Sequence, residues 1–240
     1  MSSYTAIEYL DATWNPMTGC SHVSDGCRHC WAERMAKRQR QEWGKIVLHH
    51  ERLEQPTRWR KPRRVGVCFM GDLFHELVPL LFIDSVWGMM AEARHHTFYV
   101  LTKRPMRMRD YIRGRTRKGW LRAWSNIWLG VSVENQQTAD ERIPILLDIP
   151  AAHIWVSVEP MLGPVDLVRA CGGPRHGFRW LVCGGESGPG ARPMDIEWVR
   201  GLRDQCVGAN VPFFFKQWGG VQKKRAGRVL DGITWDQRPQ

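Results

Sequence analysis

The sequence lacks any run of 18 or more apolar residues, so no segment is suited to a membrane-spanning helix. Its start, Met1–Leu10, lacks the basic segment and apolar stretch of a secretory signal peptide. Internal repeats and low-complexity segments are also absent. These absences predict a cytoplasmic protein without a membrane partner. The length of 240 residues, with 43% hydrophobic content, predicts one domain, residues 1–240, with a full core.

Acidic residues are too few to balance the basic ones. The chain holds 24 Asp and Glu against 35 Lys and Arg, which gives a net charge of +11. Such a charge attracts polyanions. The segment Lys103–Arg122 concentrates it, with nine Lys and Arg against one acid, Asp110, and Arg58–Arg64 is a second basic stretch. The alternatives are a solvated charged face and an interface with an acidic protein.

Aromatic residues, namely Tyr111, Trp120 and Trp124, are interleaved with the basic ones or follow them closely. Basic groups neutralise phosphates and aromatic rings stack on bases, so this segment predicts contact with nucleic acid. The candidate contacts are Arg104, Arg107, Arg113, Arg115, Arg117 and Lys118.

Short apolar runs alternate with helical patterns along the chain. The runs are too short for helices and apolar on both faces, as buried parallel strands are. This alternation predicts an α/β fold with a complete or partial parallel β/α (TIM-like) barrel, and a doubly wound open sheet is the alternative. The predicted strands are Val65–Met70, Thr97–Leu101, Ile127–Val133, His153–Val158, Trp180–Cys183 and Val211–Phe215.

Helical spacing lies between several of these runs. The segment Ala32–Trp43 predicts a charged, exposed helix, and Asp195 is a candidate N-cap for the helix after it. The apolar positions with helical spacing are Ile83, Val86, Trp87 and Met90 in one segment and Ile196, Val199, Leu202 and Cys206 in another.

Polar residues follow the predicted strands at their carboxyl ends, where a β/α barrel places its functional groups. Ser132 and Glu134 share one face of their strand, which would be the barrel interior. A glutamate there needs a partner or a ligand, and Lys103, Arg104 and Lys216 are candidate partners. The other polar positions at strand ends are Asp72, Glu159, Glu186 and Gln217.

Seven cysteines are present, and three of them are clustered with the spacing C-x6-C-x2-C: Cys20, Cys27 and Cys30. Thiolates suit iron–sulfur clusters and zinc, and three ligands on a four-iron cluster leave one iron open. A structural zinc site is the alternative, with His22 or His29 as fourth ligand. The scattered cysteines predict core thiols: Cys68, Cys171, Cys183 and Cys206.

The run Cys27-Arg28-His29-Cys30-Trp31-Ala32 resembles the cluster loop of the radical S-adenosylmethionine (SAM) superfamily, although the first gap has six residues where most members have three. Nearly the whole chain resembles the phage and prophage three-cysteine radical-SAM-like family. The segments that carry this second resemblance are Thr13-Trp14-Asn15-Pro16, Met70-Gly71-Asp72-Leu73-Phe74-His75, Leu101-Thr102-Lys103-Arg104-Pro105, Trp128–Glu134, Val158-Glu159-Pro160, Gly184–Gly188, Phe215–Gly220 and Asp231–Asp236.

The resemblance implies a barrel of the radical SAM type, a 4Fe-4S cluster on Cys20, Cys27 and Cys30 within a loop over residues 19–31, and a C-terminal extension over about 219–240. It implies SAM as second cofactor and an electron donor for the cluster. The implied cofactor-binding residues are His29, Gly71, Asp72, Lys103, Ser132 and Glu134. Glu159, Glu186 and Lys216 are the catalytic candidates, and the Gly184–Gly188 loop is expected to line the adenine or the substrate.

The function expected from this resemblance is a radical SAM enzyme that modifies or rearranges a nucleobase, in phage DNA more than in RNA. Its location would be the cytoplasm of a phage-infected or prophage-carrying bacterium. One alternative is a radical SAM enzyme that acts on a peptide or small metabolite. Another is a zinc-containing DNA-binding or nuclease-partner protein.

Overall fold

The computed structural model describes residues 5–117, 119, 123–174 and 176–239, so Lys118, a predicted nucleic-acid contact, lies outside the described residues. The chain divides into two compact units. The first comprises Met1–Ser21, Ala32–Gly130 and Ile149–His153, and the second comprises His22–Trp31, Val131–Asp148 and Ile154–Gln240.

Seven strands form the main sheet, and their order is β1-β4-β5-β6-β7-β8-β9. The pairings β1–β4, β4–β5, β7–β8 and β8–β9 are parallel, which confirms the α/β class with parallel strands. Because this order has no reversal, it is compatible with a partial β/α barrel, and the doubly wound alternative is wrong. The strands are β1 (Ala12–Trp14), β4 (Arg64–Val67), β5 (Thr97–Thr102), β6 (Ile127–Val133), β7 (His153–Val158), β8 (Leu181–Gly184) and β9 (Phe213–Gln217).

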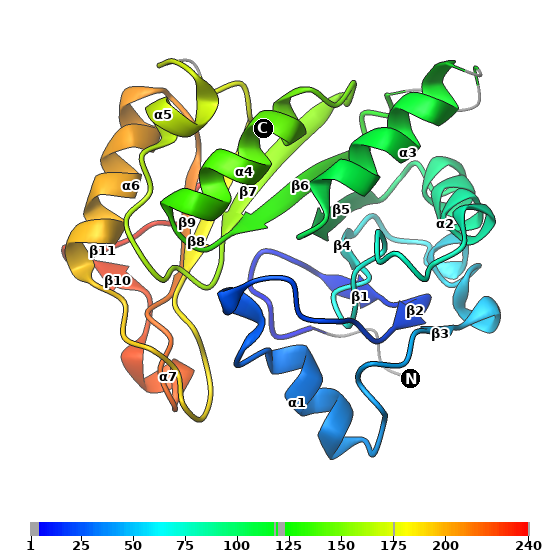
Figure 1. The fold of residues 1–240 in the computed structure, drawn as a ribbon, viewed down its shortest axis with the longest axis horizontal. Coiled ribbons are helices and arrows are strands. Elements are labelled where there is room, and N and C mark those ends of the chain that lie inside the picture. Colours follow the sequence, from blue (N-terminus) through cyan, green and yellow to red (C-terminus); the bar gives the residue numbers. More distant parts are fainter. Residues whose placement is uncertain (1–4, 118, 120–122, 175, 240) are drawn as a thin grey trace. The chain divides into compact units, whose positions relative to one another are not determined.

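In the first unit, helices α2 (Leu80–Glu92) and α3 (Pro105–Arg117) follow β4 and β5 and lie beside each other (Figure 1). The predicted apolar stripe on α2 is confirmed, because Ile83, Val86, Trp87 and Met90 are all buried. The Tyr111 hydroxyl donates to Asp84 Oδ1 at 2.8 Å, and the rings of Trp87 and Tyr111 lie 5.8 Å apart. An apolar contact and a polar contact therefore fix α2 on α3.

In the second unit, helices α4 (Gln136–Leu147), α5 (Leu167–Cys171) and α6 (Ile196–Gly208) follow β6, β7 and β8. Asp195 caps α6 as predicted, since its carboxylate accepts the Glu197 backbone N–H at 2.8 Å. Trp155 on β7 and Trp180 beside β8 stack with ring centroids 5.5 Å apart, and both are fully buried. Large aromatic side chains thus fill the core next to these strands.

Short elements complete the chain: β2 (Met17–Thr18), β3 (Val47–Leu48), α1 (Trp31–Arg38), α7 (Lys223–Ala226), β10 (Val229–Leu230) and β11 (Ile233–Thr234). Helix α1 is shorter than the predicted Ala32–Trp43, because Arg40 takes a left-handed conformation (φ 57°) that ends a helix. None of the helices in the described ranges is long and apolar enough to cross a membrane.

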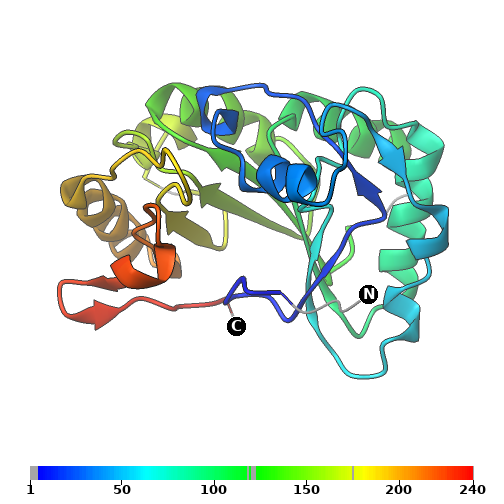
Figure 2. The same cartoon turned by 90° about the horizontal axis from the view of Figure 1, so that it is seen from below.

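The C-terminal segment, which Figure 2 shows in orange and red, contacts the strands of the second unit. The Phe215 N–H donates to Trp235 O at 2.8 Å, and Trp180 Nε1 donates to Gln237 O at 3.0 Å. Asp231 lies between Arg200 Nη2 at 2.5 Å and Arg203 Nη1 at 2.6 Å, both on α6. Hydrogen bonds from Arg200 and Arg203 lower the pKa of Asp231 to about 2.

We predict that Asp231→Asn loosens this segment and lowers Tm at neutral pH. The carboxylate stabilises the folded state above its unfolded pKa, about 4, and loses this effect as pH falls through the folded value. The Tm difference between wild type and variant should therefore shrink between pH 4 and about pH 2.

Asp204→Asn is the matched control, because Asp204 pairs only with its neighbour Arg203 on the same helix among the contacts described. A thermal scan by circular dichroism measures both variants. An Asp231→Asn protein with wild-type Tm at pH 7 would contradict the anchoring role of this carboxylate.

Candidate functional site

Backbone contacts join the residue before Cys20 to the loop that follows β4. The preceding Gly19 forms a parallel bridge with Gly71 and donates to Met70 O at 3.1 Å. Gly19 has a φ of +95°, and a Cβ there would stand 2.1 Å from Lys45 O, so only glycine fits. The first cysteine of the cluster is thereby held beside the predicted Met70-Gly71-Asp72 segment in the first unit.

Asp72 is buried at the end of this loop and accepts hydrogen bonds on both carboxylate oxygens. Oδ1 accepts the Thr102 hydroxyl at 2.7 Å and the Phe74 N–H at 3.0 Å. Oδ2 accepts the Lys103 N–H at 3.1 Å and Arg104 Nη1 at 3.2 Å. Four donors match the roughly four lone-pair sites of a carboxylate. Asp72 therefore joins the end of β4 to the end of β5.

Arg104 connects Asp72 to the cysteine loop, and its side chain is only 10% exposed. Its Nη1 lies 3.5 Å from Cys20 Sγ, and its Nη2 donates to Ser21 Oγ at 2.8 Å. Its Nε donates to Glu76 at 2.8 Å. Burial alone would lower the pKa of Arg104, but the charges of Asp72 and Cys20 outweigh it and raise that pKa. A fixed cation beside Cys20 favours the thiolate form of its sulfur.

Cys27 and Cys30 lie on one tight turn in the second unit, where the Cys30 N–H donates to Cys27 O at 3.2 Å. Glu134 contacts the residues just before this turn, since Ser24 Oγ donates to Glu134 Oε1 at 3.1 Å. A Cβ at Gly26 would stand 2.4 Å from Glu134 Cγ, so the close approach requires glycine.

Glu134 forms a buried ion pair with Arg142 of α4. Arg142 Nη1 donates to Glu134 Oε1 at 3.2 Å and to Ser132 O at 2.7 Å. Ser132 and Glu134 are buried, but so are Val131 and Val133 on the other face of β6, so burial does not decide which face is the barrel interior. Arg142 was not among the predicted partners of Glu134. Arg142 lies eight residues after Glu134, in the helix that follows β6. Its position in the sequence carries no signal that separates it from a surface arginine.

His29 and the Gly184–Gly188 loop meet at Glu186, a second buried carboxylate. His29 Nδ1 donates to Glu186 Oε2 at 2.9 Å, and Arg192 Nη2 donates to Oε1 at 2.6 Å. Arg192 Nη2 also reaches Asp25 O at 3.0 Å, in the cysteine turn. Burial would raise the pKa of Glu186, but hydrogen bonds from Arg192 and His29 lower it to about 2. Arg192, six residues after Glu186, was missed by the sequence analysis.

The remaining catalytic candidates form one ion pair in the second unit. Lys216 Nζ lies 2.7 Å from Glu159 Oε1, and Ser157 Oγ donates to Glu159 Oε2 at 3.0 Å. A Cβ at Gly185 would stand 2.0 Å from Trp218 O, so the glycines of this loop allow close packing of the segments after β8 and β9.

The scattered cysteines differ from the clustered ones in environment. Cys68, Cys183 and Cys206 are buried, and burial raises the pKa of each thiol. Cys171 is half-buried, and burial raises its pKa to about 11. The core-thiol prediction is therefore confirmed for the three buried cysteines. Among the described residues, no three or more His, Cys, Asp or Glu side chains are gathered to hold a single metal ion.

Three of the predicted nucleic-acid contacts are engaged within the first unit. Arg104 pairs with Asp72, Arg107 donates to His75 O and to Val78 O, and Arg115 Nη2 lies 2.7 Å from Asp84. Arg113 is half-buried and Arg117 is exposed on α3. The basic excess of this segment is thus partly structural.

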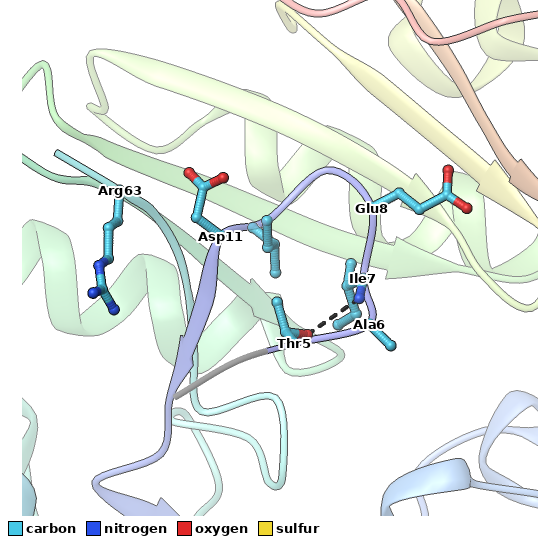
Figure 3. A pocket seen from close by; sticks show the side chains of 7 residues that line it. Thr5, Ala6, Ile7, Glu8, Asp11 and Arg63 are labelled. Atoms are coloured by element: carbon cyan, nitrogen blue, oxygen red, sulfur yellow. Dashed lines mark hydrogen bonds between the residues drawn. The ribbon is translucent and has the colours of Figure 1, made fainter. Parts of the chain in front are cut away.

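A pocket of ≈ 500 Å³ lies at the other end of the strands in the first unit (Figure 3). Asp11 and Arg63 line it and immediately precede β1 and β4. Cys20 and Asp72 come after the same two strands, so the pocket is not part of the candidate site.

We predict that Glu134→Gln destabilises the protein by about 3 kcal/mol or more, because it leaves the Arg142 guanidinium buried without its counter-charge. The side chains of Glu134 and Arg142 are only 2% and 7% exposed. Chemical denaturation measures the change in unfolding free energy.

Glu197→Gln is the control, since it breaks an exposed ion pair with Arg200 that should contribute less than about 1 kcal/mol. If both variants lowered the unfolding free energy equally, the buried Glu134–Arg142 pair would contribute no more to stability than an exposed pair, which would contradict the prediction.

Comparison with known proteins yields one match. A family model described as "Protein of unknown function (DUF5131)" matches residues 4–239. No curated protein and no solved structure matches the chain. Because the match spans both units, the chain belongs to the DUF5131 family.

Proposed function

We propose that this protein is a radical SAM enzyme whose 4Fe-4S cluster is held by Cys20, Cys27 and Cys30. The observation that carries the proposal is the Arg104 guanidinium, nearly buried and 3.5 Å from Cys20 Sγ. A cation at this distance favours the thiolate, which is the form that binds iron. Arg104 also bonds Asp72, Glu76 and Ser21, so the Cys20 sulfur is part of a buried polar network, which supports a functional role for it.

The chemistry and the spacing of the three thiols support such a cluster. The three cysteines lie within eleven consecutive residues, and the turn that carries two of them has a glycine, Gly26, where a side chain would not fit. A cluster bound through three thiolates keeps one iron for another ligand. The four scattered thiols, whose pKa values are raised by burial, are poorer ligands.

When bound, the cluster and SAM supply the electron and the sulfonium whose cleavage yields methionine and a 5′-deoxyadenosyl radical. The residues of this chain would bind and orient these groups. Both oxygens of Asp72 are already occupied by four donors, so in this proposal Asp72 positions Arg104 and does not hold the methionine amine. Glu186 orients His29 through its Nδ1, and the opposite side of that ring lies close to Gly190, where a Cβ would stand 3.4 Å from His29 Nε2.

The substrate we propose is a nucleobase in a polynucleotide, with DNA favoured by the resemblance to phage proteins. The net charge of +11 and the exposed Arg117 support it. A peptide or small metabolite is the second candidate, and the internal engagement of Arg104, Arg107 and Arg115 favours it.

The first test is anaerobic purification with iron, sulfide and zinc analysis. We expect about four irons per chain, a brown colour and release of 5′-deoxyadenosine after SAM and reductant are added. Cys20→Ser, Cys27→Ser and Cys30→Ser should each lower iron content, whereas Cys171→Ser, the matched control outside the cluster, should retain it. One zinc per chain, with no colour after reconstitution and no SAM cleavage, would replace this proposal with a structural zinc site.

The second test concerns the substrate class. Affinity for duplex DNA should fall steeply with salt, and Arg113→Gln with Arg117→Gln should reduce the slope of log K against log salt by about one to two. Arg169→Gln, an exposed arginine on α5, is the control for one lost charge outside this segment and is compared with each single variant, Arg113→Gln and Arg117→Gln. Binding that is absent or independent of salt would rule out the polynucleotide and leave the peptide or metabolite.

A further inference from the structure

Two arginines at the amino ends of neighbouring strands in the first unit lie over tryptophan rings. Arg63 Cζ lies 4.8 Å from the centre of the Trp59 ring, and Arg94 Cζ lies 4.2 Å from the centre of the Trp124 ring. Arg63 directly precedes β4, Arg94 lies between α2 and β5, and Trp124 comes shortly before β6. Because β4, β5 and β6 are neighbours in the sheet, both pairs belong to the same edge of it.

Hydrogen bonds hold these segments next to one another. His95 Nε2, one residue after Arg94, donates to Trp59 O at 2.7 Å. The Phe98 N–H at the start of β5 donates to Asn126 O, just before β6, at 2.8 Å. The segments before β4, β5 and β6 therefore form one continuous surface.

The cations of this surface are oriented but not neutralised. An aromatic ring attracts a cation through its quadrupole and carries no net charge. Among the described residues, Arg94 has no carboxylate partner, and its Nε donates to Ala91 O at 3.1 Å. Arg60 and Lys61, in the segment before β4, are exposed and form no ion pair within the described part of the chain. The arginine–tryptophan surface consists of Trp59, Arg60, Lys61, Arg63, Arg94 and Trp124.

Few acidic groups offset this charge. Figure 3 shows Glu8 and Arg63 at opposite sides of the pocket that both line. Glu92, at the end of α2, lies two residues before Arg94 and offsets part of the charge there. Two further carboxylates are already paired, Asp11 with Arg64 at 2.7 Å and Glu54 with Arg58 at 3.0 Å. The surface therefore keeps an excess of positive charge.

The exposure of these side chains favours phosphates over bases as the bound groups. Trp59 and Trp124 are half-buried beneath their arginines, and the His96 ring lies 5.6 Å from that of Trp59, so stacking on bases is not their role. Arg94 is exposed, and a guanidinium held flat on a ring keeps its N–H groups for phosphate oxygens. The rings thus fix the arginines in advance of binding.

The same surface is poorly suited to a protein or a membrane. Protein interfaces have an apolar centre, and membrane-binding faces insert apolar side chains between the lipids. Among the described residues, none of the exposed large apolar side chains belongs to the arginine–tryptophan surface. Its chemistry is that of a phosphate-binding surface.

We propose that the arginine–tryptophan surface binds the phosphate backbone of the polynucleotide, away from the base that is modified; this inference rests on the polynucleotide substrate of the proposed function and not on its cluster. Cys20 and Asp72 follow β1 and β4 at their carboxyl ends. The amino ends lie about 20 Å away, since β5 has six residues and a strand rises about 3.3 Å per residue. A base or a small metabolite bound at Cys20 does not reach that far, whereas a polymer does.

The experiment measures binding of the full chain to a fluorescein-labelled DNA duplex of about 30 base pairs, by fluorescence anisotropy at several salt concentrations. Arg60→Gln combined with Lys61→Gln removes two exposed cations, so folding should be unaffected. We expect the slope of log K against log salt to fall by about two, and the Kd to rise about tenfold or more at about 0.1 M salt. Arg94→Gln should lower the slope by about one, whereas Arg94→Lys keeps the charge and should retain the slope.

Arg38→Gln is the matched control for one lost charge. Arg38 is exposed at the end of α1 and, like Arg60, forms no ion pair among the residues that the structure describes. Its slope should equal that of the wild type. Iron content and SAM cleavage, measured on the same preparations, should be equal in all variants, so that a missing cluster is recognised separately from a missing surface.

A wild-type slope in the double variant would overturn the arginine–tryptophan surface and leave the polynucleotide substrate standing. A wild-type chain that does not bind the duplex would overturn both. Two further results would overturn the choice of partner: tighter binding to vesicles of phosphatidylcholine and phosphatidylserine than to the duplex, or displacement of the duplex by polyglutamate of equal charge as readily as by unlabelled DNA.

Discussion

The buried guanidinium of Arg104 is the contact on which the candidate site of the first unit depends. It binds Asp72, Glu76 and the Cys20–Ser21 segment together, so it joins the loop after β4 to the cysteine loop. Its desolvation would be costly if one of these partners were absent. Since Asp72 also accepts from Thr102 and Lys103 at the end of β5, the strand ends and the cysteine loop are fixed as one polar network.

In the second unit, two buried carboxylates hold the cysteine turn in position. Glu134 supports the cysteine turn through Ser24 and the bare backbone of Gly26, and Glu186 supports it through His29. Each carboxylate is itself satisfied by an arginine, Arg142 or Arg192. A loop of eleven residues with three thiols has little apolar surface of its own to bury, so its conformation must come from such charge-assisted bonds.

The sequence predicts an element correctly where a single physical feature, such as an apolar run, determines it. The strands β6 and β7 match their predicted bounds, because their mainly apolar runs are long enough for a buried strand and too short for a helix. Strand β4 ends at Val67, three residues earlier than predicted, because Cys68 adopts a φ of 57° that no apolar pattern reveals. The arginines Arg142 and Arg192 were missed for another reason: a surface arginine and a buried one look identical in sequence, and only the neighbouring carboxylate distinguishes them.

The same distinction limits what net charge can indicate about partners. Arg104, Arg107 and Arg115 lie in the most basic segment, yet each is engaged by a carboxylate or by backbone carbonyls. Arg104 and Arg115 each have a carboxylate within 3 Å, so they contribute little to the field at the surface, because each pair acts as a dipole and salt screens the remainder. The carbonyls that bind Arg107 fix its position but do not neutralise its charge. The partner of this segment is therefore better inferred from what stays uncompensated there.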